Sequence, residues 1–272
     1  MMILSFILFS IPFTSSLILY IKLKSYYIYS ISILLYVISL FALVKGGCTD
    51  PGIIPRQMGN SDAIFRKKRE FNIVSNGSFV KFSYCYTCNI FRPPRTSHCA
   101  QCDNCCQRFD HHCMWLGNCI GKRNYKYFFL LVLTLIINAF IEIIYNIVVV
   151  VQSFIDKEEK KIKLRLVTIA VLSLVAFVDL MFIIFFLGPL QFTHLNLLIN
   201  NITFYEKVKK KLVNPAEINP FYKNIYQHIY RLIIKFSPKS LLNGYRRIQS
   251  KYNGEININK EYVIHNNKFD IK

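Results

Sequence analysis

The chain has 272 residues, of which 53% are hydrophobic and 18% are charged, and its mean hydropathy is +0.31. This combination argues against a wholly soluble protein, and 23 Phe and 17 Tyr exclude intrinsic disorder over most of the length. The net charge of +19 could indicate a nucleic acid or an anionic surface as partner. Because the excess of Lys accompanies an excess of Ile, Asn, Tyr and Phe, as in proteins of A/T-rich genomes, we expect no nucleic acid partner.

Four stretches are long enough to cross a bilayer, which takes about 20 mostly apolar residues. They are residues 1–21, 25–44, Tyr127–Ile155 and Leu166–Leu187. Two acids lie within them, Glu142 and Asp179, and an acid in a membrane span is a candidate functional group. The alternative, which we favour, is that each acid faces the helix bundle and forms hydrogen bonds with neighbours such as Asn138 or Asn146.

Basic residues predict which side of the membrane each loop occupies. Residues 45–126 contain thirteen Lys and Arg, and residues 188–272 contain fourteen. The positive-inside rule therefore places both segments in the cytosol, and four spans then put both termini there. We predict an all-α polytopic membrane protein with four transmembrane helices and a cytosolic domain between helices 2 and 3. The expected parts are residues 1–44 with helices 1 and 2, the loop 45–126, residues 127–187 with helices 3 and 4, and the C-terminal segment 188–272.

Cysteine and histidine gather in the first of the two cytosolic segments. Eight of the nine Cys lie between Cys85 and Cys119, together with three of the six His. The cytosol is reducing, so bound metal is favoured over disulfides, and a Cys-x-x-Cys pair supplies two ligands of a tetrahedral zinc site from one turn. We expect this domain to consist of hairpins and turns stabilised by zinc, because so short a loop has little core of its own. Two zinc ions need eight of the eleven side chains, and spacing alone does not decide how they pair.

Asp110, His111 and Cys113 form a second pattern in the same loop. An acid, an imidazole and a thiol within four residues can act as orienting acid, general base and nucleophile, because the thiolate is the reactive form of cysteine. Two other interpretations compete with this one. Cys113 could be a thiol remote from any chemistry, and His111 could be a zinc ligand, and spacing leaves both open.

The run from Cys85 to Phe128 reads C-x2-C-x3-RPPRTSHC-x2-C-x2-C-x4-DHHC-x-W-L-x-N-C-I-G-x2-N-x3-F. It resembles the cysteine-rich domain of the DHHC protein S-acyltransferases, or palmitoyltransferases, with every metal-type position filled. The four-span layout is also similar to that of the family. Three motifs outside the domain resemble the family as well: Asp50-Pro51-Gly52 (DPG), Thr203-Phe204-Tyr205-Glu206 (TTxE) and Asn219-Pro220-Phe221.

The resemblance implies two interleaved structural zinc sites and one uncoordinated nucleophile. One zinc would be bound by Cys85, Cys88, His98 and Cys105, and the other by Cys99, Cys102, His112 and Cys119. Cys113 would then be the nucleophile, with His111 as general base and Asp110 orienting it, while Cys106 would have no role. Such an enzyme moves palmitoyl from acyl-CoA to cysteines of substrate proteins through an acyl-enzyme. The Golgi or the ER is the expected membrane.

Charge and position predict where acyl-CoA and lipid bind. The CoA phosphates require basic residues near Cys113, and the nearest in sequence are Arg92, Arg95, Lys122 and Arg123. Trp115 and Phe128 are candidates for the mouth of an acyl-chain cavity, the alternative being ordinary aromatic residues of the membrane interface. Basic clusters at 66–69 and 209–211 are expected to contact anionic lipids, and residues 222–236 fit a basic amphipathic helix on the membrane.

Four positions depart from the family pattern. Met114 replaces a proline, Asn224 a glycine and His228 an asparagine, and none of these changes removes a ligand or the nucleophile. Phe204 replaces the second threonine of TTxE, which in the family contacts the active-site acid, so that contact is not expected. Two alternatives to an enzyme are a catalytically silent zinc-binding scaffold of the same family and a membrane-anchored zinc module that binds a protein or nucleic acid. The second gives no reason for a thiol directly after Asp110-His111-His112.

Overall fold

The computed structural model describes residues 26–56, 70–75, 78–155, 162–209 and 240–241. The chain divides into two compact units. The first contains Met1–Gly47, Met114–Gly117 and Lys126–Asn196, and the second contains Cys48–Cys113, Asn118–Tyr125 and Leu197–Lys272. Several expected features lie outside the described residues: the span 1–21, the basic clusters at 66–69 and 210–211, the motif 219–221, the helix 222–236, Asn224 and His228.

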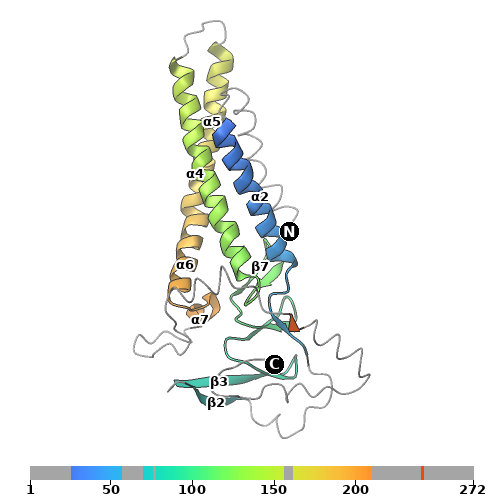
Figure 1. The fold of residues 1–272 in the computed structure, drawn as a ribbon. Coiled ribbons are helices and arrows are strands. Elements are labelled where there is room, and N and C mark those ends of the chain that lie inside the picture. The colour runs from blue at the N-terminus through green and yellow to red at the C-terminus, as the bar shows by residue number, and fades with distance from the viewer. Residues whose placement is uncertain (1–25, 57–69, 76–77, 156–161, 210–239, 242–272) are drawn as a thin grey trace. The chain divides into compact units, whose positions relative to one another are not determined.

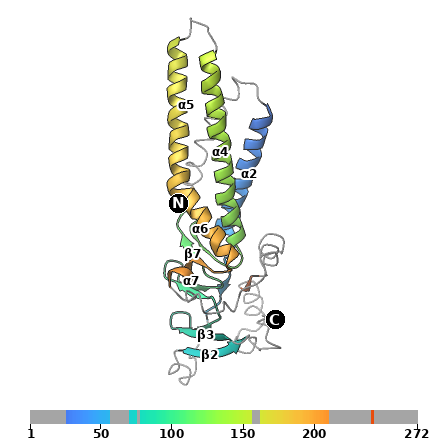
Figure 2. The same cartoon turned by 90° about the vertical axis from the view of Figure 1, so that its left-hand side faces the viewer.

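The first unit is helical. Its elements are α2 (Tyr26–Cys48), α4 (Tyr125–Ile155), α5 (Ile162–Phe182), the π-helical turn η2 (Ile183–Leu187) and α6 (Gly188–Ile199). Figures 1 and 2 show α2, α4 and α5 running alongside one another. Within the part of the chain that the structure describes, three stretches are long and apolar enough to cross a membrane: Ser30–Cys48, Tyr125–Gln152 and Ile169–Ile199.

Polar and aromatic contacts join α2 to α4. Ser39 Oγ donates a hydrogen bond to Thr134 Oγ1 at 2.8 Å, and both side chains are buried. The rings of Phe41 and Tyr127 meet edge to face, with their centroids 6.1 Å apart. In a membrane, where no hydrophobic force draws helices together, small hydroxyl residues allow close approach and supply hydrogen bonds across the interface.

A polar stripe runs along the buried face of α4. It recurs every four residues, which places its members on one side of a helix, and it consists of Thr134, Asn138, Glu142 and Asn146, all buried. Asn138 Nδ2 donates a hydrogen bond to Glu142 Oε1 at 3.0 Å. The prediction that Glu142 faces the bundle and is hydrogen-bonded by a neighbour is therefore confirmed. The same prediction is not confirmed for Asp179, whose buried Oδ2 has no hydrogen-bond partner among the described residues.

The helical segment after α5 is longer than the sequence predicts. We expected a span that ends at Leu187, before Gly188-Pro189, whereas α6 continues to Ile199. A proline lacks the helical N–H, and its ring clashes with the carbonyl four residues back. The π turn relieves this conflict, because the Gly188 N–H bonds to the Ile183 carbonyl five residues back. The helix bends at this point, as Figure 2 shows for α5 and α6.

The second unit consists mainly of short strands. Three small sheets form it, with strand orders β2-β3-β4, β1-β6-β5 and β7-β8. The elements are β1 (Ile53–Ile54), β2 (Glu70–Ser75), β3 (Ser78–Cys85), β4 (Ile90–Arg92), β5 (Ser97–Cys99), β6 (Asn104–Cys106), β7 (His111–Cys113), β8 (Asn118–Ile120) and the short helix α7 (Phe204–Val208). The hairpins expected for the cysteine-rich loop are therefore confirmed, and the all-α class describes the helical unit alone. Closely spaced Cys and His leave too few residues between them for helices, whereas hairpins bring such side chains together.

Asp50 of the DPG motif anchors the first strand of this unit. Its Oδ1 accepts hydrogen bonds from the N–H groups of Gly52 and Ile53, both at 2.8 Å, which is an Asx turn. Its Oδ2 pairs with Arg123 Nη1 at 2.7 Å and accepts a hydrogen bond from Ser240 Oγ. This turn leads into β1, which then pairs with β6.

Gly121 marks the closest packing of the unit. A Cβ at this position would lie 2.4 Å from Cys106 Sγ and 2.7 Å from the Pro51 carbonyl oxygen, so only glycine fits. Cys106 is fully buried, and burial raises the pKa of its thiol. Its Sγ lies 3.6 Å from the carbonyl oxygens of Pro51 and Gln107. Cys106 is thus a protonated packing residue.

Candidate functional site

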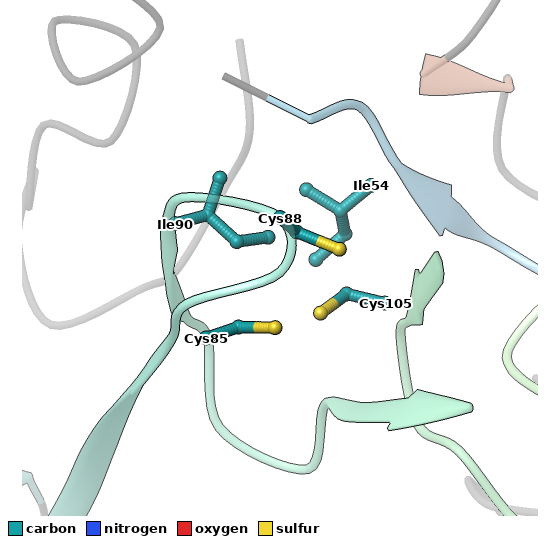
Figure 3. Close-up of a cluster of buried hydrophobic side chains, with 5 residues drawn as sticks. All are labelled: Ile54, Cys85, Cys88, Ile90 and Cys105. Atoms are coloured by element: carbon teal, nitrogen blue, oxygen red, sulfur yellow. The ribbon is translucent and has the colours of Figure 1, made fainter. Parts of the chain in front are cut away.

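Four side chains of metal-ligand type converge between the β3–β4 and β5–β6 hairpins. Their ligand atoms lie within 4.8 Å of one another, and they form the first set: Cys85, Cys88, His98 and Cys105. The three sulfurs lie 3.4 to 3.8 Å from His98 Nδ1. Figure 3 shows these sulfurs pointing toward one another, with Ile54 and Ile90 beside them. The two apolar side chains keep water from this side of the first set.

A second group of the same composition lies one hairpin further along. Its ligand atoms also fall within 4.8 Å of one another, and they form the second set: Cys99, Cys102, His112 and Cys119. The three sulfurs lie 3.2 to 3.8 Å from His112 Nδ1, and Cys102 and Cys119 are 3.4 Å apart at Sγ. The structure therefore groups the eight residues in the same two sets that the family resemblance implies.

Each set joins two neighbouring hairpins by the same pattern. In the first set, two cysteines come from the β3–β4 hairpin, and the other two ligands are register partners across β5 and β6, His98 opposite Cys105. In the second set, two cysteines come from the β5–β6 hairpin, and His112 is the register partner of Cys119 across β7 and β8. Residues of the middle hairpin contribute to both sets, which accounts for the interleaved order along the chain.

The donors and distances suit zinc. Tetrahedral Zn²⁺ with bonds of about 2.3 Å to sulfur and about 2.0 Å to nitrogen separates its ligand atoms by about 3.5–3.8 Å, close to the observed separations. Burial raises the pKa of the Cys105 and Cys119 thiols, so a dication is needed to hold them as thiolates. Asp103 Oδ1 lies 3.6 Å from His98 Nε2, as a carboxylate behind a ligating imidazole often does. Both sets could therefore bind a metal ion.

Strand β7 carries the predicted catalytic residues on the face opposite its metal-type ligand. Successive side chains of a strand point to opposite faces, so His112 points into the second set while His111 and Cys113 point the other way. His111 Nδ1 lies 2.8 Å from Asp110 Oδ2. Asp110 is 2% exposed and Cys113 is 7% exposed. The structure thus brings the acid, the imidazole and the thiol together, outside both sets.

At His111, hydrogen bonds and nearby charges raise the pKa of the ring by more than burial lowers it. Burial of the ring opposes its protonation, but hydrogen bonds with Asp110 and Cys113, and the charges of both groups, raise the pKa of His111 to about 9. The ring therefore carries a proton at neutral pH, and a protonated imidazole stabilises an adjacent thiolate. Burial instead lowers the pKa of His112, which suits a neutral metal ligand.

Phe204 contacts the acid through its backbone. The Phe204 N–H donates a hydrogen bond to Asp110 Oδ1 at 2.8 Å, so the amide takes the place of the threonine hydroxyl. The Phe204 ring lies edge to face with the His111 ring, with centroids 6.4 Å apart. The side-chain contact is absent, as the sequence predicts, but a backbone donor reaches the same acid. Asp110 is held through both of its oxygens, by α7 on one side and by His111 on the other.

Comparison with known proteins agrees with this arrangement. Residues 78–211 match the family model described as DHHC palmitoyltransferase. This segment is therefore similar to the DHHC palmitoyltransferases. The chain is 43% identical over 133 residues to palmitoyltransferase ZDHHC9 of Bos taurus, a match covering 43% of this chain and 37% of that protein. It is 34% identical over 239 residues to palmitoyltransferase ZDHHC18 of Mus musculus, covering 81% of this chain and 62% of that protein. The match thus spans less than two thirds of either relative.

The basic residues expected to contact CoA fall into two groups. Arg95 and Arg123 form ion pairs within the second unit, at 2.8 and 2.7 Å. Arg92 is half-buried and donates a hydrogen bond to the Ser83 carbonyl, whereas Lys122 is exposed. The two paired arginines already have a carboxylate partner, so Lys122 and Arg92 are the more accessible of the four to a phosphate.

The two aromatic candidates differ in exposure. Trp115 is 49% exposed, as suits a residue at a membrane surface or at a cavity mouth. Phe128 is 4% exposed, and its ring packs against that of His194 with centroids 4.8 Å apart. Phe128 is therefore part of the packing between α4 and α6 within the helical unit.

The sequence identified the motif at residues 203–206 but not the contacts by which it holds Asp110. Glu206 and Thr203 form a capping box at the start of α7, and Arg95 binds Glu206 across 111 positions of sequence. A local signal for part of this was present, because Thr-x-x-Glu is the pattern of a capping box and predicts a helix that begins after Thr203. No local signal identifies the arginine.

Proposed function

We propose that the chain is a protein S-acyltransferase that moves palmitoyl or a similar long acyl group from acyl-CoA to cysteines of substrate proteins. One observation carries the proposal: Cys113 lies outside both metal-binding sets, beside an imidazole that a buried carboxylate holds at 2.8 Å. A zinc module that only binds a partner needs neither an uncoordinated thiol nor an oriented base. The names of the relatives support the same reaction.

The first step forms an acyl-enzyme. His111 holds the proton while the Cys113 sulfur, as the thiolate, attacks the carbonyl carbon of the acyl-CoA thioester. The bond from that carbon to the CoA sulfur breaks, and His111 gives the proton to the departing CoA thiolate. Asp110 keeps the imidazole in the required orientation and stabilises its protonated form.

The second step transfers the acyl group to protein. The thiol of a substrate cysteine gives its proton to His111 and attacks the carbonyl carbon held on Cys113. The bond to Cys113 Sγ breaks, and the sulfur leaves as a thiolate beside the protonated His111, which restores the resting site. Dividing one transfer between two large partners into two steps lets CoA leave before the protein substrate reacts.

Zinc in both sets would have a structural role in this enzyme. The first set would hold one ion and the second set the other, each through three thiolates and one imidazole. Bound zinc supplies folding free energy to a domain with little apolar core. Through His112 and Cys119, the second set would also hold β7, and with it Cys113.

The membrane arrangement that we propose has four spans, with the cysteine-rich domain and both termini in the cytosol of Golgi or ER membranes. The acyl chain would lie among the helices, where its removal from water is worth about 0.8 kcal/mol per CH2. Lys122 and Arg92 would contact the CoA phosphates, and the cytosolic basic clusters would contact anionic lipids.

Acyl-enzyme formation tests the proposal. Purified full-length protein incubated with palmitoyl-CoA should form a hydroxylamine-sensitive adduct that Cys113→Ser abolishes. Cys106→Ala is the matched control, because it removes a buried thiol that belongs to neither set, and it should keep the adduct. All three proteins should contain two zinc ions per chain. Folded wild-type protein with two zinc ions and no adduct would overturn the enzyme and favour the silent scaffold.

A further inference from the structure

The contact between α7 and Asp110 depends on how that short helix begins. Thr203 is the residue that caps α7, and its hydroxyl accepts a hydrogen bond from the Glu206 N–H at 3.2 Å. The Glu206 carboxylate returns the interaction by accepting from the Thr203 N–H at 2.8 Å. This reciprocal capping box fixes the first turn, so the Phe204 N–H is directed at Asp110 Oδ1.

Arg95 fixes the capping box in turn. Its Nε and Nη2 reach the two oxygens of Glu206 at 2.8 and 2.9 Å, and such a two-point contact sets orientation as well as distance. Both side chains are mostly buried, 10% and 7% exposed, so solvent screens the pair less than it screens a surface ion pair. Arg95 has a φ of +65°, which is unusual for a residue with a side chain. The turn that requires this angle is closed by the Thr96 N–H on the Pro93 carbonyl at 3.1 Å.

Asn201 gives the same arginine a second anchor. Arg95 Nη2 donates to the Asn201 carbonyl at 2.9 Å, and Nη1 donates to its Oδ1 at 3.2 Å. Asn201 has a φ of +50° at the end of α6, where its N–H bonds to Leu198 and the next N–H bonds to Leu197. This is a Schellman ending. One guanidinium therefore holds both the end of α6 and the start of α7.

We propose that Arg95 and Glu206 are positioning residues that hold the start of α7 so that the Phe204 amide orients Asp110, and through it His111, for attack by Cys113. The proposal rests on the proposed acyltransferase function and assigns to Arg95 a role other than CoA binding. With Phe204 at this position, the orientation of Asp110 depends on how Arg95 and Glu206 hold α7. The Phe204 side chain has no hydroxyl, and its backbone amide is the donor to the acid. An amide cannot rotate toward Asp110 on its own, so its direction depends on the helix that bears it.

Replacing Phe204 tests the amide directly. Phe204→Pro removes the N–H, and proline is favoured at the first position of a helix. The preceding Thr203 has φ −90° and ψ 159°, which proline tolerates in its neighbour. Phe204→Ala is the matched control, because it removes the ring and keeps the N–H. We expect acyl-enzyme formation by Phe204→Pro to be about ten- to a hundredfold slower than by Phe204→Ala, the range for losing a hydrogen bond to a charged group.

Neutral substitutions test the ion pair. Glu206→Gln keeps a capping-box acceptor but weakens the contact with Arg95, and Arg95→Gln removes the cation. We expect either change to lower the rate of acyl-enzyme formation at saturating palmitoyl-CoA about three- to tenfold, with the KM for palmitoyl-CoA unchanged. The double variant should be faster than the Arg95→Gln single variant, because two neutral amides can pair and no buried charge is left alone.

Three outcomes would overturn the positioning role. They are equal rates for the proline and alanine variants, a raised KM with an unchanged maximal rate in Arg95→Gln, and a double variant slower than both single variants. The second outcome would return Arg95 to CoA binding. Zinc content and thermal unfolding of every variant identify those that fail to fold. Wild-type protein that forms no adduct would contradict the acyltransferase itself, so the two failures are distinguishable.

Discussion

The two metal-binding sets use the same donors in the same local geometry, and they differ in what their strands carry. In each set a histidine faces a cysteine across a hairpin, at His98–Cys105 and at His112–Cys119. On β5, the residue that follows His98 is Cys99, which is consumed by the second set. On β7, the residues that flank His112 are His111 and Cys113, and neither belongs to the first or the second set.

The comparison shows how a repeated structural unit can become reactive. Strand alternation sends every second side chain away from the metal-binding face, so a three-residue strand with one central ligand leaves two positions for other chemistry. On β7 these two positions hold the imidazole of His111 and the thiol of Cys113, beside the buried Asp110. The same fold element therefore yields a structural site in one place and a candidate active site in the next.

The largest expected effect is a difference in the rate of acyl-enzyme formation between the His112→Ala and His98→Ala variants. Because β7 bears Cys113, His112→Ala should slow acyl-enzyme formation about a hundredfold or more, the cost of misplacing a reacting group by about an ångström. His98→Ala should slow it about tenfold at most, because its strand carries no reacting group. Both variants should lose one of two zinc ions, measured by atomic emission on purified protein. Equal losses of activity would mean that the two sets do not differ in function.

Gly121 tests the packing that joins the sets, since it follows β8 and lies against Cys106, next to Cys105 of the first set. Gly121→Ala forces a Cβ to within 2.4 Å of Cys106 Sγ and should lower the free energy of unfolding by about 2–3 kcal/mol. Gly117→Ala is the control: nothing lies within 4 Å of its Cβ, and only its positive φ costs stability, about 1 kcal/mol. Thermal unfolding of both variants measures the difference. A Gly121 variant no less stable than the Gly117 variant would contradict the close packing.

Asp103 distinguishes the sets by metal affinity, since its carboxylate lies behind His98 of the first set. Asp103→Asn should weaken zinc binding at the first set about tenfold, the usual cost of losing such a partner, and should leave the second set unchanged. Competition with a colorimetric chelator measures this as earlier release of one ion of the two. Release of both ions at the same chelator concentration as in wild type would contradict the role of Asp103.

The smallest expected effect is the pH dependence of the Asp110–His111 pair. The pKa of His111 is raised from 6.5 to about 9 in the folded protein, so the pair stabilises the fold fully below pH 6.5. This contribution is lost as the pH rises through about 9. The stability advantage of wild type over His111→Gln should therefore shrink by about 1–2 kcal/mol across that window. An advantage that grows with pH would mean that the ring is neutral when folded.

Much of this site followed from local pattern. The roles of Cys113, His111 and the eight ligand-type residues could be read from spacing and family resemblance. Strand alternation then explains why His111 and His112, although adjacent in sequence, point to opposite faces of β7. The hairpins of the cysteine-rich unit were predicted from its closely spaced ligands, but the register that pairs each histidine with a cysteine was not, because hydropathy says nothing about a domain held by side-chain donors. The bend at η2 was also missed, since Gly188-Pro189 ordinarily ends a helix and a π turn has no clear sequence signal.

The sequence by itself determined which side chains can react and which can bind metal, because these properties depend on residue type and on neighbours within a few positions. Only the tertiary structure decided how the acid is held. The Phe204 amide reaches Asp110 across 94 positions, and Arg95 reaches Glu206 across 111. Such contacts depend on where the chain returns after the helices, and no local pattern encodes that return. Phe204 looked like a lost contact in the sequence because the backbone, which carries no residue identity, makes the contact instead.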